Sequence, residues 1–114
     1  MAKNDIEIII YKILSYLYEK MKIGERPEFT DMCWDSQLMH IPEKYWKQVM
    51  MELIDKNFVK GFQYRYTKDG ITVDQFGNAG ITLEGREFLV NNSGMAKAKE
   101  FLGNAFEILL SQII

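Results

Sequence analysis

Two sets of side chains in this sequence have the types and spacing to bind a polyanion. The first set is Lys44, Lys47 and Gln48. Lys47 and Gln48 follow Lys44 by three and four residues. On an α-helix this spacing places side chains on one face. Lysine binds phosphate oxygens, and a glutamine amide can make two hydrogen bonds with adenine in a DNA major groove. The alternative is an ordinary solvated helix face, which the lack of arginine and the presence of Asp55 on the same stripe favour.

The second set is Lys60, Arg65 and Lys68, in a stretch where apolar and polar residues alternate. This alternation is typical of a β-strand. Cations on such a strand can contact DNA phosphates. The alternative is that they keep an exposed strand from pairing with other chains, which the neighbouring Asp69 and Asp74 favour. The residues alone leave both interpretations open.

No motif for catalysis or metal binding accompanies these cations. The only cysteine is Cys33 and the only histidine is His40, and their spacing is not that of metal ligands. We interpret them as a buried thiol and a partly exposed imidazole. A glycine-rich phosphate loop, Cys-x-x-Cys and His-Glu-x-x-His are all lacking. We therefore expect a binding protein that is not an enzyme and that uses no cofactor or metal ion.

The charge of the chain is unevenly distributed. The net charge is −2, which weighs mildly against nucleic-acid binding. Residues 42–68, however, carry six basic and three acidic side chains, or +3, whereas residues 1–41 carry −2 and residues 69–114 carry −3. A polyanion responds to charge within a Debye length of about 8–10 Å. The positive middle of the chain is therefore the candidate nucleic-acid surface.

Length and composition indicate one globular domain. The chain has 114 residues, of which 47% are hydrophobic and 26% charged. Its start, MAKNDIEIII, lacks the long apolar region and cleavage site of a signal peptide, and no apolar run is long enough for a membrane span. With one unpaired cysteine, we expect a cytoplasmic protein without a membrane partner.

A period of three and four residues predicts the first helix. Asn4 or Asp5 can cap it, and it runs to about Lys22, where Gly24 follows as a stop signal. Its apolar stripe consists of Ile6, Ile9, Ile10, Ile13, Leu14, Leu17 and Met21.

Two further helices are predicted before residue 57. A short one has Thr30 or Asp31 as its cap. The next starts with Pro42 as its first helical residue and ends near Lys56, with Asn57 as a left-handed terminator. Its apolar stripe consists of Trp46, Val49, Met50, Leu53 and Ile54.

From residue 58 the period changes to two, which predicts a β-hairpin. Its strands are residues 58–66 and 71–76, joined by a turn that contains the Asp69-Gly70 pair. Residues 77–80 are predicted to form a turn or a bulge. Alternate aromatic residues of the first strand could stack on bases, but we interpret them as the packing face of the hairpin. They are Phe62, Tyr64 and Tyr66.

Two helices are predicted to complete the chain, with Thr82 and Ser93 as their caps. The last helix is apolar around more than half of its circumference. We expect it to form the interface of a two-fold dimer, and the alternative is that it folds back on its own domain. The predicted interface residues are Phe101, Phe106, Leu109, Leu110 and Ile113.

This order of elements predicts an α+β fold, a winged helix-turn-helix. Three helices form the core, the hairpin forms the wing, and a C-terminal helix is added. We expect a winged-helix domain at residues 1–93, with residues 94–114 packing on the first helix or forming a dimer interface.

The segment IPEKYWKQVMMELIDKNFVKG (residues 41–61), followed by a polar hairpin and ITLEGREFL (residues 81–89), resembles the YjcQ family. These are small, phage-associated winged-helix proteins of Gram-positive bacteria. The similarity covers nearly the whole chain and implies a winged-helix fold. The family has no established activity or catalytic residues that could be transferred to this sequence.

The sequence therefore favours a winged-helix protein that binds double-stranded DNA, of the kind found in phage-derived transcriptional regulators. In this hypothesis Lys44, Lys47 and Gln48 contact the groove. Lys60, Arg65 and Lys68 contact phosphates. The alternative is a winged-helix module of a prophage that binds another protein and not DNA.

Overall fold

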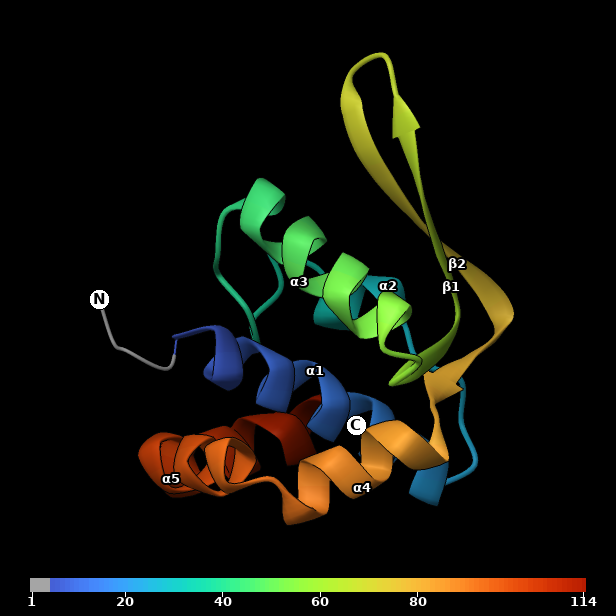
Figure 1. The fold of residues 1–114 in the computed structure, drawn as a ribbon. Helices are drawn as coiled ribbons and strands as arrows, with labels where there is room; N and C mark the ends of the chain where they lie inside the picture. The colour runs from blue at the N-terminus through green and yellow to red at the C-terminus, as the bar shows by residue number, and fades with distance from the viewer. Residues whose placement is uncertain (1–4) are drawn as a thin grey trace.

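Residues 5–114 are described by the computed structural model, and they form helices and one antiparallel hairpin in the predicted order (Figure 1). The fold is the predicted α+β winged helix-turn-helix with a C-terminal helix. The predicted cap Asn4 lies outside the described residues. The elements are α1 (Asp5–Lys22), α2 (Phe29–Met32), α3 (Glu43–Asp55), β1 (Val59–Thr67), β2 (Gly70–Ile81), α4 (Leu83–Asn91) and α5 (Ser93–Ile113).

Helix α1 forms the middle layer of the molecule. α3 and the hairpin lie on one side of it, and α4 and α5 lie on the other (Figure 1). The amphipathic period of α1 explains why one face of this helix is buried. Tyr11 and Ser15 are buried as well, because α4 and α5 cover the other side of α1. The Tyr11 ring packs against Phe106 of α5, with 5.9 Å between ring centroids.

Helix α2 begins before the residues that were predicted to cap it. It spans four residues, and the predicted caps Thr30 and Asp31 lie inside it, so that prediction was wrong. Glu28 is the N-cap, without a side-chain hydrogen bond. The Asp31 carboxylate instead accepts a hydrogen bond of 2.9 Å from the hydroxyl of Tyr16 on α1. The Asp31 side chain therefore binds Tyr16, which is distant in sequence, although its local position indicated a helix cap.

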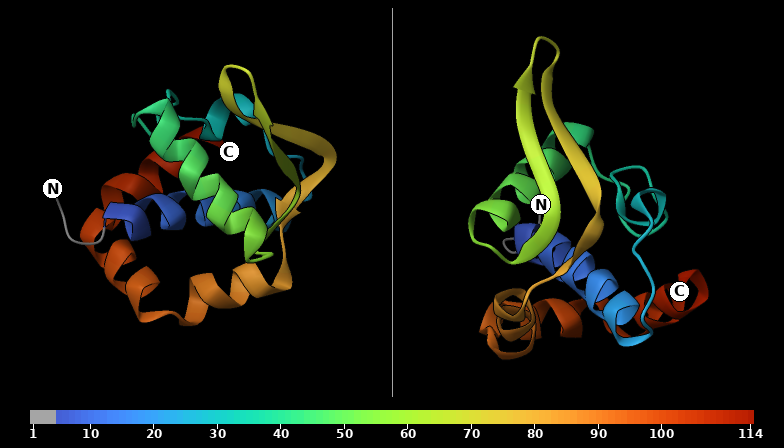
Figure 2. Two further views of the ribbon diagram at one scale, coloured as in Figure 1. Left: turned by 45° about the horizontal axis from the view of Figure 1, so that its top comes forward. Right: turned by 90° about the vertical axis from the view of Figure 1, so that its right-hand side faces the viewer.

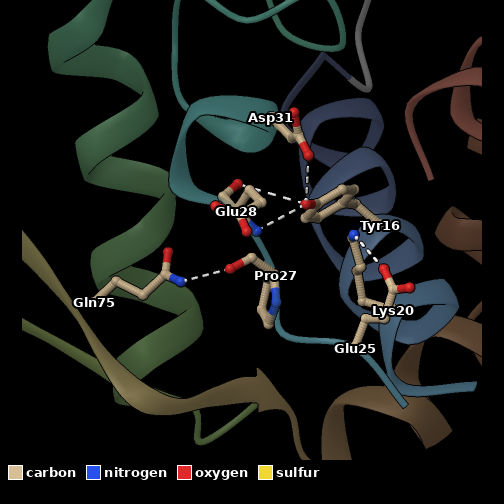
Figure 3. Close-up of polar contacts among 7 residues, drawn as sticks. All are labelled: Tyr16, Lys20, Glu25, Pro27, Glu28, Asp31 and Gln75. Carbon is tan, nitrogen blue, oxygen red and sulfur yellow. Dashed lines mark hydrogen bonds and ion pairs between the residues drawn. The ribbon is translucent and has the colours of Figure 1, made fainter. Parts of the chain in front are cut away.

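The loop of residues 23–28 connects α1, α2 and the hairpin (Figure 3). The backbone N–H of Glu28 donates to the Tyr16 hydroxyl at 2.9 Å. The Lys20 ammonium pairs with Glu25 at 3.1 Å. On the other side, the Gln75 side-chain amide donates to the Pro27 carbonyl at 2.9 Å. These bonds fix the hairpin relative to α1.

Helix α3 begins one residue later than predicted. Pro42 is its N-cap, with an extended ψ of 141°, rather than its first helical residue. The buried stripe is confirmed for Trp46, Val49, Met50 and Leu53. Asn57 has φ +60°, which confirms it as the left-handed terminator.

The hairpin is longer than predicted and contains a bulge. Between two register pairs, β1 contributes only Gly61, whereas β2 contributes residues 76–79. Gly61 has φ +73°, and a Cβ there would lie 2.4 Å from the backbone of Ala79. The segment 77–80, predicted as a turn or a bulge, is therefore part of a bulge that only glycine at 61 permits.

The aromatic face of the hairpin is only partly a packing face. Phe62 and Val73 are buried, and Tyr64 is half-buried. Tyr66 is 74% exposed, so its predicted packing role was wrong. The hairpin extends beyond the core helices, so side chains near its end are not buried in the core (Figure 1).

The predicted N-cap of α4 is confirmed, whereas the predicted N-cap of α5 is wrong. Thr82 caps α4 as predicted, accepting from the Gly85 N–H at 3.0 Å. Asn92, not Ser93, caps α5, because its side-chain oxygen accepts from the N–H groups of Gly94 and Met95. Either residue has the right chemistry, and the asparagine lies at the non-helical position.

Helix α5 consists of two segments that pass around α1 (Figure 2). They meet at Gly103, whose φ of +62° and ψ of −158° are not helical. Met95 and Ala98 are buried before the break, and Phe106 and Leu110 are buried after it. Both segments therefore pack on the core of the same chain, and a long straight helix does not form.

The bulge gives a direct test of the hairpin geometry. Gly61→Ala should lower the free energy of unfolding by about 2–4 kcal/mol, because positive-φ strain and overpacking each cost about 1–3 kcal/mol. Gly77→Ala is the matched control, since a Cβ there meets no atom within 4 Å. It should change the free energy by less than about 1 kcal/mol. Urea unfolding measures both, and equal effects would contradict this geometry.

We expect the buried Tyr16 hydroxyl to make the folded protein less stable at alkaline pH. Burial raises the pKa of Tyr16 above its usual value of 10.0, so the unfolded chain releases this proton first. The contribution of Tyr16 to the free energy of unfolding is fully present below pH 10. It falls as the pH rises further, by about 1.4 kcal/mol per pH unit. Tyr16→Phe should cost about 1–3 kcal/mol at neutral pH. Its alkaline slope should be shallower than that of the wild type, and identical slopes would refute the assignment.

Candidate nucleic-acid interface

The N-terminal half of α3 and the turn of the hairpin enclose a groove on the molecular surface. Its volume is about 290 Å³. The two elements approach each other there because the hairpin rises beside α3 (Figure 2). The groove is lined by Glu43, Lys44, Lys47, Gln48, Asp69, Gly70 and Ile71.

Lys44 and Gln48 are the most accessible of the predicted groove residues. Both are exposed, and they lie one turn apart on the outer face of α3. Within residues 5–114, Lys44 forms no ion pair. Its ammonium is therefore free to bind an external anion.

Lys47 lies in the same groove but its charge is already engaged. Its ammonium pairs with Glu43 at 2.6 Å and lies 5.5 Å from the centre of the Trp34 ring. Only 19% of the Lys47 side chain is exposed. An incoming phosphate would have to displace Glu43, so Lys47 is a weaker contact than the sequence indicated.

The end of the wing carries one exposed cation and one paired cation. Lys68 is exposed in the turn. The Arg65 side chain pairs across the hairpin with Asp74, with Nε 3.0 Å from the carboxylate. Arg65 is 65% exposed, so its remaining N–H groups face solvent. Lys68 is therefore accessible to an external anion, whereas Arg65 already has a carboxylate partner.

Lys60 lies at the opposite end of the hairpin from Lys68. It pairs with Gly80 in the register, while the tip pair is Thr67 and Gly70. Seven residues of extended chain separate Lys60 from Thr67, which corresponds to about 23 Å. The structure therefore does not bring Lys60 together with the residues of α3 and the wing tip.

Asp55 and Tyr64 position the wing relative to α3, a role that the sequence pattern does not indicate. The Tyr64 hydroxyl donates to the Asp55 carboxylate at 2.7 Å, which ties β1 to the end of α3. This hydrogen bond raises the pKa of Tyr64. Asp55 lies 11 residues beyond Lys44 on α3, or about 16 Å. Its charge is thus directed at the wing and is remote from the groove.

The groove itself is of mixed charge. Glu43, Lys44 and Lys47 line it from α3, and Asp69 lines it from the hairpin. A strongly basic surface is not formed, and any phosphate contact there relies on individual lysines rather than on a continuous positive field.

The predicted dimer residues are divided between the core and the surface. Phe106 and Leu110 are buried against α1 of their own chain, and Leu109 and Ile113 are partly buried. Phe101 is 67% exposed, on the segment of α5 before the break. Ile108, which was not predicted, is 58% exposed. A contact between two copies would therefore use a smaller apolar surface than the sequence indicated.

In residues 5–114, no group of three or more histidine, cysteine, aspartate or glutamate side chains is placed to hold a metal ion. None of the helices in that part of the chain is both long and apolar enough to cross a membrane.

Residues 11–105 match the family model described as YjcQ protein. This chain belongs to the YjcQ family. The match covers α3, the hairpin and the first segment of α5, and so includes every predicted DNA contact of this YjcQ-family chain. Phe106, Leu109, Leu110 and Ile113 lie beyond the matched range. No curated protein sequence and no solved structure matches the chain.

Proposed function

We propose that this YjcQ-family protein is a non-catalytic DNA-binding protein of the transcription-regulator type. It binds duplex DNA with the outer face of α3 in the major groove and the wing on the backbone. The observation that carries the proposal is the exposed Lys44–Gln48 face beside the wing tip, which no other element covers within residues 5–114. In winged helices, this helix and this hairpin are the elements that meet DNA.

The dimensions of the two elements support this arrangement. α3 has 13 residues, or about 20 Å, which suits the length over which a helix can follow a major groove. Gln48 lies on the groove side, where its amide can pair with an adenine. Lys44 on α3 and Lys68 in the turn of the wing supply phosphate contacts.

Affinity should be modest because few cations are free. Among residues 5–114 Lys44 and Lys68 have no ion-pair partner, and Lys47 and Arg65 must exchange a carboxylate for a phosphate. About two to four phosphate contacts per protomer give a salt slope of about −2 to −4 in log K against log salt. A specific site would then require two protomers.

A second candidate function is binding to another protein through the same groove. The acidic side chains of Glu43 and Asp69 favour it, because they complement a basic partner and repel phosphate. This function predicts no affinity for duplex DNA even at low salt.

Charge reversal distinguishes the two functions. Lys44→Glu combined with Lys68→Glu should weaken binding to a random duplex at low salt by at least about tenfold. Lys97→Glu combined with Lys99→Glu on α5 makes the same charge change at exposed positions outside the groove, and it should have a much smaller effect. Fluorescence anisotropy measures all three proteins. No binding by the wild type, or equal loss in both variants, would contradict the proposal.

We also propose that the protein forms a two-fold dimer through the exposed surface of α5. Such a dimer would place two α3 helices about 34 Å apart and favour a palindromic site. Phe101→Glu should convert the dimer to a monomer, because it places a charge in the apolar contact. Lys99→Glu, two residues before Phe101 and therefore on a different face of the helix, is the control. Sedimentation of the wild type as a monomer at micromolar concentration would contradict the dimer.

A further inference from the structure

A second cavity lies at the base of the hairpin, away from the groove beside α3. It is bounded by the end of α1, by the loop of residues 23–28 and by the bulge of β2. Its volume is about 350 Å³. We call it the bulge cavity. Its lining includes the charged residues Lys20, Glu25, Arg26 and Lys60.

The lining of the bulge cavity is strongly cationic for its size. Three cations face one carboxylate, which leaves a net charge of +2. Within residues 5–114, neither Arg26 nor Lys60 forms an ion pair. Two positive charges at the cavity therefore have no counter-ion in the described chain.

Lys20 is the buried member of this group. Its side chain is only 7% exposed, whereas the side chain of its partner Glu25 is 59% exposed (Figure 3). A buried ammonium needs a close anion, because desolvation disfavours its charge. Glu25 lies on the exposed loop of residues 23–28, so solvent and ions can reach its carboxylate. It therefore occupies a position that an external anion can take over.

The wall of the cavity on the β2 side carries few side chains, because two of its residues are glycines. It is formed by Gly77, Asn78, Ala79 and Gly80 of the bulge. A Cβ at Gly77 would meet no atom within 4 Å, so packing does not require glycine there. Because residue 77 has no side chain, a ligand can approach the backbone closely there.

We propose that the bulge cavity binds a phosphate-bearing anion. The anion displaces the Glu25 carboxylate from Lys20 and is held by Arg26 and Lys60 at the rim. Phosphate fits this set of partners, because arginine binds two of its oxygens in parallel and lysines neutralise its remaining charge.

This site is separate from the proposed DNA interface. Lys60 lies about 23 Å along the hairpin from the wing tip. The phosphate comes either from the DNA backbone or from a free phosphorylated small molecule. If it is a free molecule, its binding beside Pro27, which holds Gln75, couples a ligand to the anchor of the hairpin.

Pyrophosphate is the probe that tests the site. Titrated into the isotope-labelled full chain, it should cause saturable shifts in the backbone amides of residues 24–26 and 77–80. Arg26→Gln combined with Lys60→Gln should weaken binding by at least about tenfold. Lys97→Gln combined with Lys99→Gln removes the same charge elsewhere and should leave binding unchanged. Shifts that do not saturate, or equal loss in both double variants, would overturn the proposal.

Glu25→Gln separates a ligand site from a merely structural ion pair. It removes the competing carboxylate, so pyrophosphate should bind more tightly than to the wild type. An unchanged or weaker affinity would overturn the proposal. Backbone amide spectra recorded before titration establish that each variant is folded.

Short duplex DNA distinguishes the two sources of phosphate. Shifts at residues 77–80 that disappear in the Arg26→Gln, Lys60→Gln variant identify the DNA backbone as the ligand. Shifts confined to α3 and the wing tip, together with saturable pyrophosphate binding, identify a free phosphorylated molecule. Because pyrophosphate binding does not involve α3 or the wing tip, this test fails or succeeds independently of the proposed DNA binding.

Discussion

The position of the hairpin is the constraint on which the functional surfaces depend. A two-stranded hairpin is marginally stable alone, so it must be held by the helices. Phe62 and Val73 bury its inner face, and the Tyr64 hydroxyl binds Asp55 at the end of α3. Gln75 binds the Pro27 carbonyl on the opposite side. These contacts flank the hairpin and set its direction relative to α3.

One hairpin thereby creates two different surfaces. Its tip stands beside the exposed face of α3, and its base closes a cationic cavity with the end of α1. Gly61 separates the two regions, because its positive φ admits the extra residues of β2. The additional layer of α4 and α5 buries the far side of α1, so α1 is fixed from both directions.

The sequence was informative where a local pattern decides the structure. The periods of α1 and α3, the Asp69-Gly70 turn and the left-handed Asn57 could all be predicted, because each depends on neighbouring residues. The caps of α2 could not, because Asp31 is used by Tyr16, 15 residues earlier. The separation of Lys60 from Lys68 depends on strand register, and the pairing of Lys47 with Glu43 competes with any ligand. Side-chain type alone does not carry that information.

The proposed DNA surface consists of α3 and the wing tip together. Hydrogen–deuterium exchange of the full chain, with and without duplex DNA at low salt, tests it most directly. We expect slower exchange in residues 43–51 and 67–71 when the duplex is present. Protection confined to α4 and α5, or no protection at a duplex concentration that saturates binding, would contradict it.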